Sequence, residues 1–193
     1  MNWRQQGVWL LPLMLMLAPS AHAEPAAMLA GVWPPTPSTA AAIIDKTTPL
    51  DRYGRAKVIT NQESLLSQGK VVMDGSVENP VWRLAEQAAR RARRGLWTTL
   101  PLLTAHQVGE GTGEFSLVRG RVQSFFQSYD DRYLNFGPDW KTDFTLRIPR
   151  RYWKQFPDTK KLVGKNIEAR GILHTRNGAM ITLLFPGQIE VLP

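Results

Sequence analysis

The side chains best suited to binding chemistry lie in the second half of the chain, where arginines alternate with apolar residues. Single-stranded nucleic acid requires a basic groove with aromatic side chains, because arginine pairs with phosphate and a ring stacks on a base. We predict a nucleic-acid-binding face made of Arg119, Arg121, Tyr133, Asn135, Thr145 and Arg147. The carboxylates of Asp130, Asp131 and Asp143 lie nearby in the sequence and oppose the binding of a polyanion.

Few residues are suited to nucleophilic or metal chemistry. The 193 residues contain no Cys, which excludes a disulfide scaffold, a Cys nucleophile and a thiolate zinc site. Three glycines between His106 and Gly113 suggest a phosphate-binding loop, but the Lys-Ser/Thr ending and a following helix are missing. We therefore interpret residues 104–113 as a Gly-rich linker, and we expect no cofactor.

A hydrophobic period of two places the predicted binding face on strands. Strands are predicted at 118–126, 133–136, 143–148, 165–174 and 180–184, with a short helix at 149–156 and a turn at Asn177-Gly178. Alternation puts Leu134, Phe136, Phe144, Leu146 and Ile148 inside, and leaves Arg119, Arg121 and Phe125 on an outward face. This order, with Gly120 where the first strand bends, predicts a five-stranded OB barrel over residues 114–193.

The first half contains two predicted helices. Asn61 and Gly69 flank a short one, and Asn79-Pro80 starts a longer one that ends at Gly95. On the longer helix, one face at helical spacing collects Val81, Leu84, Ala85, Ala88 and Ala92. Together with the strands, these helices predict a mainly β protein with short helices, in the α+β class.

The motif Asp51-Arg52-Tyr53-Gly54-Arg55 resembles the D-[RK]-Y-G-R motif of the staphylococcal-nuclease-like (thermonuclease) family. Residues 63–69, containing Leu65-Leu66, and residues 86–97, ending in Gly95-Leu96-Trp97, are similar to two helices of that family. The resemblance covers residues 28–98 and implies a truncated thermonuclease-like domain over residues 24–103. The second half resembles OB-fold domains appended to such nuclease-like segments in bacterial exported proteins.

The family's activity is calcium-assisted phosphodiester hydrolysis, which needs carboxylates for the metal, a Glu for the attacking water and two arginines for the phosphate. Arg55 matches the second arginine. Met28, Trp33 and Thr36 stand where the family has the first arginine, a metal-binding Asp and the Glu. The resemblance therefore implies a pseudo-nuclease with no metal and no catalytic residue, in which Arg55 is a remnant. A divergent calcium-dependent nuclease is the alternative.

Residues 1–23 have the features of a signal peptide: Arg4, an apolar run at 8–17 and the sequence Ala21-His22-Ala23. They predict a periplasmic or secreted protein that has no membrane contact after cleavage. The formal net charge of +8 favours an anionic partner. We expect an exported, non-catalytic protein that binds single-stranded nucleic acid or another polyanion. An OB-fold adaptor that binds protein or glycan is a further alternative, and the sequence leaves the oligomeric state open.

Overall fold

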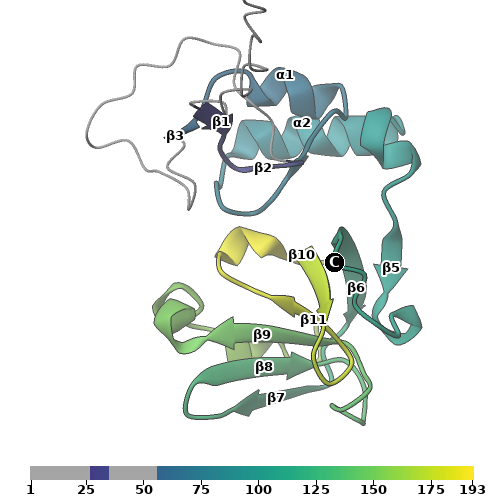
Figure 1. The fold of residues 1–193 in the computed structure, drawn as a ribbon, viewed down its shortest axis with the longest axis vertical. Helices are drawn as coiled ribbons and strands as arrows, with labels where there is room; N and C mark the ends of the chain where they lie inside the picture. Colours follow the sequence, from purple (N-terminus) through teal and green to yellow (C-terminus); the bar gives the residue numbers. More distant parts are fainter. Residues whose placement is uncertain (1–26, 35–55) are drawn as a thin grey trace, which may run out of the picture.

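The computed structural model describes residues 27–34 and 56–193, and in these ranges the protein is mainly β with short helices (Figure 1). The predicted fold class is thereby confirmed. The predicted signal peptide, Thr36, and the motif that carries Asp51 and Arg55 lie outside the described residues. A helical part built from residues 27–34 and 56–101 lies above a large sheet built from residues 102–193 (Figure 1).

The helical part combines two helices with four short strands. Its elements are β1 (Ala27–Leu29), β2 (Val32–Trp33), β3 (Ala56–Val58), α1 (Gln62–Ser67), β4 (Val72–Met73), α2 (Pro80–Arg91) and a 3₁₀ helix (Gly95–Thr98). β1 pairs with β3 in parallel, and β2 pairs with β4 in antiparallel orientation. Leu66, Val71 and Trp82 are buried together between the helices and the strands, which gives this part a small core of its own.

The predicted start of α2 and the predicted end of α1 are confirmed, but Asn61 makes no side-chain capping bond to α1, and α2 ends at Arg91 rather than at Gly95. The Asn79 side chain accepts hydrogen bonds from the backbone nitrogens of Val81 and Trp82, at 2.9 and 3.2 Å, and caps α2. Gly69 follows α1 with a φ of +69°, a left-handed conformation that favours glycine after a helix.

The predicted inward face of α2 is wrong. Val81 and Leu84 are exposed, whereas Trp82, Glu86 and Ala89 are buried. The large ring of Trp82 packs in the core with Leu66 of α1. The carboxylate of Glu86 accepts hydrogen bonds from Arg170 on β10, in the sheet. The spacing of apolar residues does not predict the burial of Glu86, because a charged residue is buried only where a partner from elsewhere in the chain pairs with it.

The sheet part contains β5 (Leu102–Thr104), β6 (Phe115–Arg121), β7 (Ser124–Gln127), β8 (Asp131–Asn135), β9 (Thr145–Pro149), β10 (Asn166–Thr175), β11 (Ala179–Thr182) and β12 (Ile189–Val191). Four 3₁₀ helices connect them: Ala105–Gln107, Arg150–Gln155, Thr159–Leu162 and Pro186–Gln188. The strand order is β5-β6-β10-β11-β9-β8-β7, and β12 also pairs with β10. β9 and β11 are parallel, and the other pairs from β6 to β12 are antiparallel.

β6 and β7 are two halves of one bent segment. The backbone nitrogen of Val122 donates to the Lys165 carbonyl at 3.0 Å, whereas that of Gln123 donates to the Asn135 carbonyl at 2.8 Å. The segment therefore pairs with β10 before the bend and with β8 after it. The sheet curls back on itself through this segment, although no backbone ladder in the described chain joins β5 to β7. This connectivity agrees with the expected OB-fold in its partly open form.

The predicted inward positions hold on β8 and β9, although Thr145, expected outside, is only 3% exposed, and the alternation fails at the bend. All five residues expected inside, from Leu134 to Ile148, are buried. On the bent segment Val122 and Phe125 both face the core, three residues apart, so the bend inserts one residue and reverses the faces. Phe125 is therefore partly buried, and Phe126 is exposed, the reverse of the prediction.

Residues 104–113, expected as a linker, are docked onto the sheet. β5 pairs in parallel with β6, and Ala105 and Val108 are buried in the core of the sheet part. The backbone nitrogen of Gly113 donates to the Leu173 carbonyl at 2.8 Å. The segment that connects the helical part to the sheet part is therefore packed on the sheet and is not a free linker.

Candidate functional site

The outer face of β7, β8 and β9 carries a groove of about 630 Å³. The loop between β8 and β9 and the turn between β10 and β11 also contribute to its walls. The groove is lined by Ser124, Phe125, Phe126, Ser128, Tyr133, Asn135, Trp140, Thr145, Arg176, Asn177 and Met180. Its size lies in the range of ligand-binding pockets in proteins, about 300–1,000 Å³.

Three aromatic rings in this groove are accessible to a ligand. Phe126 stacks on Tyr133, with ring centroids 6.2 Å apart and planes at 24°. The side chain of Phe126 is 58% exposed and that of Trp140 is 55% exposed. The ammonium group of Lys141 lies 5.7 Å from the Trp140 ring centroid. Exposed rings of this size present flat apolar surface next to a positive charge.

The floor of the groove is polar. The Asn135 amide donates to Ser124 Oγ at 3.2 Å, and the Thr145 hydroxyl donates to Asn135 Oδ1 at 3.3 Å. At the rim, the predicted turn between β10 and β11 is confirmed, with φ of 54° at Asn177 and 79° at Gly178. This tight turn holds Arg176 at the edge of the groove, where its guanidinium adds positive charge.

Beside the groove, Asp131 joins Tyr133 to Arg147. The Tyr133 hydroxyl donates to Asp131 Oδ2 at 3.0 Å, and Arg147 Nη2 lies 2.9 Å from Asp131 Oδ1. Burial, together with the nearby Asp131 carboxylate, raises the pKa of Tyr133 above 10.0. Tyr133 is therefore a neutral ring at physiological pH, and Arg147 is occupied in neutralising Asp131.

The structure brings together only part of the predicted face. Tyr133, Asn135 and Thr145 line the groove, and Arg147 is paired with Tyr133 in the β8–β9 ladder. Arg121 does not line the groove; its Nε donates to the Gly164 carbonyl at 3.1 Å. Arg119 lines a separate cleft under α2, so its expected place on a common outward face is wrong.

Of the groove residues absent from the predicted face, the exposed rings of Phe126 and Trp140 matter most for binding. Phe126 was assigned to the interior because the extra residue at the bend was not recognised. Trp140 follows the turn residues Gly137-Pro138-Asp139. A large aromatic residue in such a polar turn indicates a ring that is exposed and accessible to a ligand.

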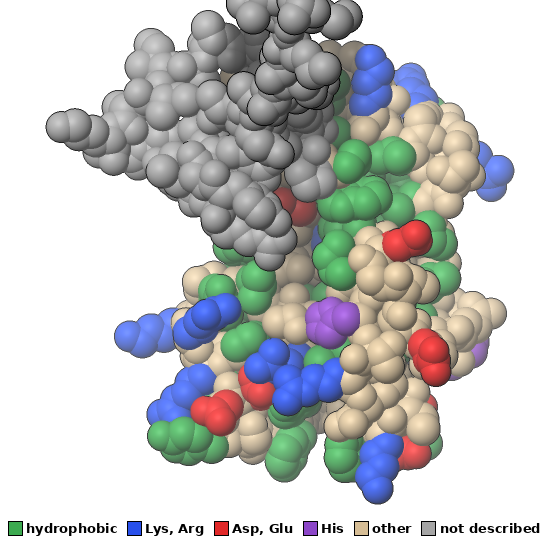
Figure 2. All heavy atoms as spheres, viewed as in Figure 1, with side chains coloured by type: hydrophobic (Ala, Val, Ile, Leu, Met, Phe, Trp, Pro, Cys, Tyr) green, Lys and Arg blue, Asp and Glu red, His purple; other side chains and the backbone are tan. Residues whose placement is uncertain are grey.

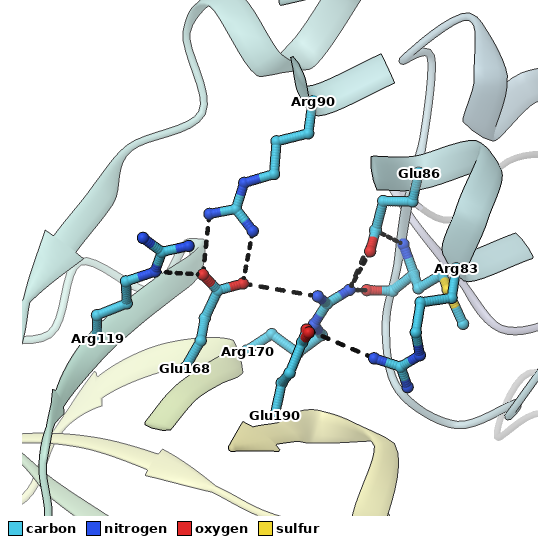
Figure 3. A network of polar contacts seen from close by, with 8 residues as sticks. Arg83, Glu86, Arg90, Arg119, Glu168, Arg170 and Glu190 are labelled. Carbon is cyan, nitrogen blue, oxygen red and sulfur yellow. Dashed lines mark hydrogen bonds and ion pairs between the residues drawn. The ribbon is translucent and has the colours of Figure 1, made fainter. Parts of the chain in front are cut away.

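A second polar site lies between α2 and the sheet (Figure 3). Glu168 on β10 is only 1% exposed. Arg90 of α2 donates to both of its carboxylate oxygens at 2.9 Å, and Arg119 Nε of β6 donates at 2.7 Å. Arg90 also lies over the Trp97 ring, 5.0 Å from its centroid. This network ties the helical part to the middle of the sheet.

A second pair lies deeper in the same interface. Arg170 Nη1 donates to both oxygens of Glu86, at 3.0 and 2.9 Å, and to the Met73 carbonyl at 3.0 Å. Arg83 and Glu190 form a longer contact of 3.5 Å at the rim, where both side chains are about one third exposed (Figure 3).

Burial raises the pKa of Glu168, but the hydrogen bonds and charges of Arg90 and Arg119 outweigh burial and hold this pKa below its ordinary value of 4.5. The hydrogen bond to Glu168 outweighs burial at Arg90 and raises the pKa of that guanidinium. Glu168 is therefore ionised in the folded protein.

This lowered pKa predicts an acid-sensitive interface. The stabilisation from Glu168 is fully present above pH 4.5, its unfolded value, and is lost as the pH falls through the lower folded value. Urea unfolding of the full chain between pH 7 and pH 3 measures it. We expect the Glu168→Gln variant to lose less stability over this range than the wild type, because it lacks the titrating group. Parallel curves for the two proteins would contradict this assignment.

The described residues contain no cluster of metal-binding side chains and no helix long and apolar enough to cross a membrane. Met28 lies in β1. Trp33, which the resemblance placed at a metal-binding position, stacks on Phe115 with ring centroids 4.9 Å apart. Trp33 therefore packs the helical part against the sheet.

No protein-family model matches the chain, and a search of curated proteins finds no match. Among solved structures, the chain is similar to an OBody bound to hen egg-white lysozyme, at 16% identity and a TM-score of 0.31. The match covers 42% of this chain and 80% of that one.

Proposed function

We propose that this protein is an exported, non-catalytic binder of single-stranded nucleic acid that holds bases in the groove over β7, β8 and β9. The observation that carries the proposal is the stacked pair Phe126–Tyr133 beside exposed Trp140 and the guanidinium of Arg176. Stacking on aromatic side chains in a positively charged groove is how proteins bind single strands without strong sequence preference.

The distribution of charge supports a polyanionic ligand. The formal net charge is +8, and Figure 2 shows Lys and Arg side chains over the large sheet, interspersed with Asp and Glu side chains. Of the acidic residues that oppose binding, Asp131 is paired with Arg147, and the Asp143 carboxylate accepts from the backbone nitrogen of Asp139 at 2.7 Å. The pairing with Arg147 reduces the repulsion that a phosphate meets beside Tyr133.

Export to the periplasm or the medium is part of this proposal and rests on residues 1–23, which the structure does not describe. The lack of catalysis rests on the neutral residues Met28, Trp33 and Thr36 in the nuclease-like segment. Arg55, the one matching residue of the family's site, lies outside the described residues.

Phe126→Ala is expected to weaken the binding of a single-stranded oligothymidylate by about 5- to 150-fold, because a stacked base contributes about 1–3 kcal/mol. The side chain is exposed, so its removal leaves the core intact. Fluorescence anisotropy at low and high salt measures the affinity. Leu84→Ala is the matched control, since Leu84 is equally accessible but lies on α2, and it should bind like the wild type.

The other ligands in this titration separate the alternatives. Equal affinity for duplex DNA, or for an acidic glycan, would contradict base stacking and favour an adaptor with a merely charged surface. Cleavage of the oligonucleotide with Ca²⁺ or Mg²⁺ would overturn the non-catalytic assignment. Binding that is absent at low salt would contradict the proposal altogether.

A further inference from the structure

The cleft between α2 and strands β6, β10 and β12 has a volume of about 200 Å³. One water molecule takes about 30 Å³ in the liquid, so the cleft is large enough for a small polyatomic ligand. The cleft and the aromatic groove share no lining residue, so they are separate sites.

Positive charge exceeds negative charge in this cleft. Its lining contains five arginines, Arg83, Arg90, Arg91, Arg119 and Arg170, and three glutamates, Glu86, Glu168 and Glu190. Each glutamate is bonded to an arginine. Two arginine charges are left without a matching carboxylate, in a partly enclosed space where charge interactions are stronger than in bulk water.

The side-chain N–H groups of the arginines that carry this excess charge have few hydrogen-bond partners within the described residues. Arg119 uses only its Nε, for Glu168, and its two terminal nitrogens have no partner among the described residues (Figure 3). Arg91 and the Gln87 amide also line the cleft, and neither has a hydrogen bond or ion pair within the described chain. Arg119 is held in place by Glu168, so its free nitrogens are preorganised for a ligand rather than mobile.

We propose that this cleft binds a small tetrahedral oxyanion of the phosphate class, either free phosphate or the phosphomonoester of a small molecule. Guanidinium groups donate parallel hydrogen bonds that match the geometry of phosphate oxygens. Arg91 and Arg119 supply the charge, and Gln87 supplies a neutral donor. Glu168 does not repel the ligand strongly, because Arg90 already matches its charge and donates to both of its carboxylate oxygens.

Isothermal titration of the full chain with inorganic phosphate, at ionic strength held constant with chloride, tests this site. We expect saturable binding that Arg91→Ala weakens at least tenfold and Gln87→Ala weakens less, since Arg91 is exposed and its loss leaves the buried network intact. Arg151→Ala is the control: Arg151 is also exposed, lies over Tyr152 outside the cleft, and should not affect binding.

The sources of phosphate are distinguished by a parallel titration with adenosine monophosphate. Binding of both ligands with the same sensitivity to Arg91→Ala supports a phosphomonoester, and binding of inorganic phosphate alone supports the free ion. The proposal is overturned if no saturation occurs, or if Arg151→Ala and Arg91→Ala weaken binding equally. Oligothymidylate binding in the aromatic groove is measured on the same samples and succeeds or fails independently.

Discussion

Replacing Arg170 with methionine is expected to lower the free energy of unfolding by about 3–5 kcal/mol, the cost of removing one partner of a buried ion pair. Arg170 is 4% exposed and holds both oxygens of Glu86 and the Met73 carbonyl. Methionine fills much of the same volume but leaves the Glu86 carboxylate buried without its counter-charge. Urea unfolding of the full chain measures the loss.

Two further variants make this prediction specific. Arg83→Ala removes an ion pair of similar composition at the exposed rim and should cost less than about 1 kcal/mol. Combining Arg170→Met with Glu86→Leu should recover part of the stability, because the second change removes the stranded charge. An Arg170→Met protein as stable as Arg83→Ala would show that the buried pair does not hold the interface.

Gly75→Ala is the second substitution with a large expected effect. Gly75 has a φ of +86°, and a Cβ there would lie 2.5 Å from the Gln188 nitrogen and 2.7 Å from the Gly187 carbonyl carbon. The left-handed conformation costs about 1–2 kcal/mol with a side chain. The displaced backbone of the sheet part costs about 1–3 kcal/mol more.

Gly109→Ala is the matched control, because a Cβ at Gly109 has no atom within 4 Å. It should leave the stability unchanged or raise it slightly. Both variants are compared by urea unfolding at pH 7. If Gly75→Ala is as mild as Gly109→Ala, the contact between Gly75 and the 3₁₀ helix Pro186–Gln188 is not tight in solution.

The sequence was sufficient to predict the elements whose pattern is local. Alternation along β8 and β9, the cap at Asn79 and the turn at Asn177-Gly178 each depend on residues that are neighbours in the chain. Both helices, the strands β6 to β11, the mainly β class and three of the groove residues follow from such local patterns, whereas β1 to β5 and β12 were not predicted.

The features that were missed depend on contacts between distant residues. Alternation predicts that Arg119 faces outward, but it does not predict its partner, because the buried carboxylate of Glu168 lies 49 positions away in the sequence. The bend at residues 122–123 is fixed by hydrogen bonds to β10 on one side and to β8 on the other. Residues 104–113 contain too few apolar residues for a period, yet Ala105 and Val108 are buried by strands from elsewhere.

The strand β6 has a consequence for how such a protein can evolve. Its Phe115 and Leu117 form one apolar cluster with Val72, Trp33 and Trp97 of the helical part, while its continuation β7 forms a wall of the groove. A gene fusion that carried residues 114–193 alone to another protein would expose this apolar cluster. It would also leave Arg170 without its partner Glu86, and Glu168 without its partner Arg90. The two parts must therefore be inherited together, and substitutions on α2 are constrained by the sheet as strongly as by the helix itself.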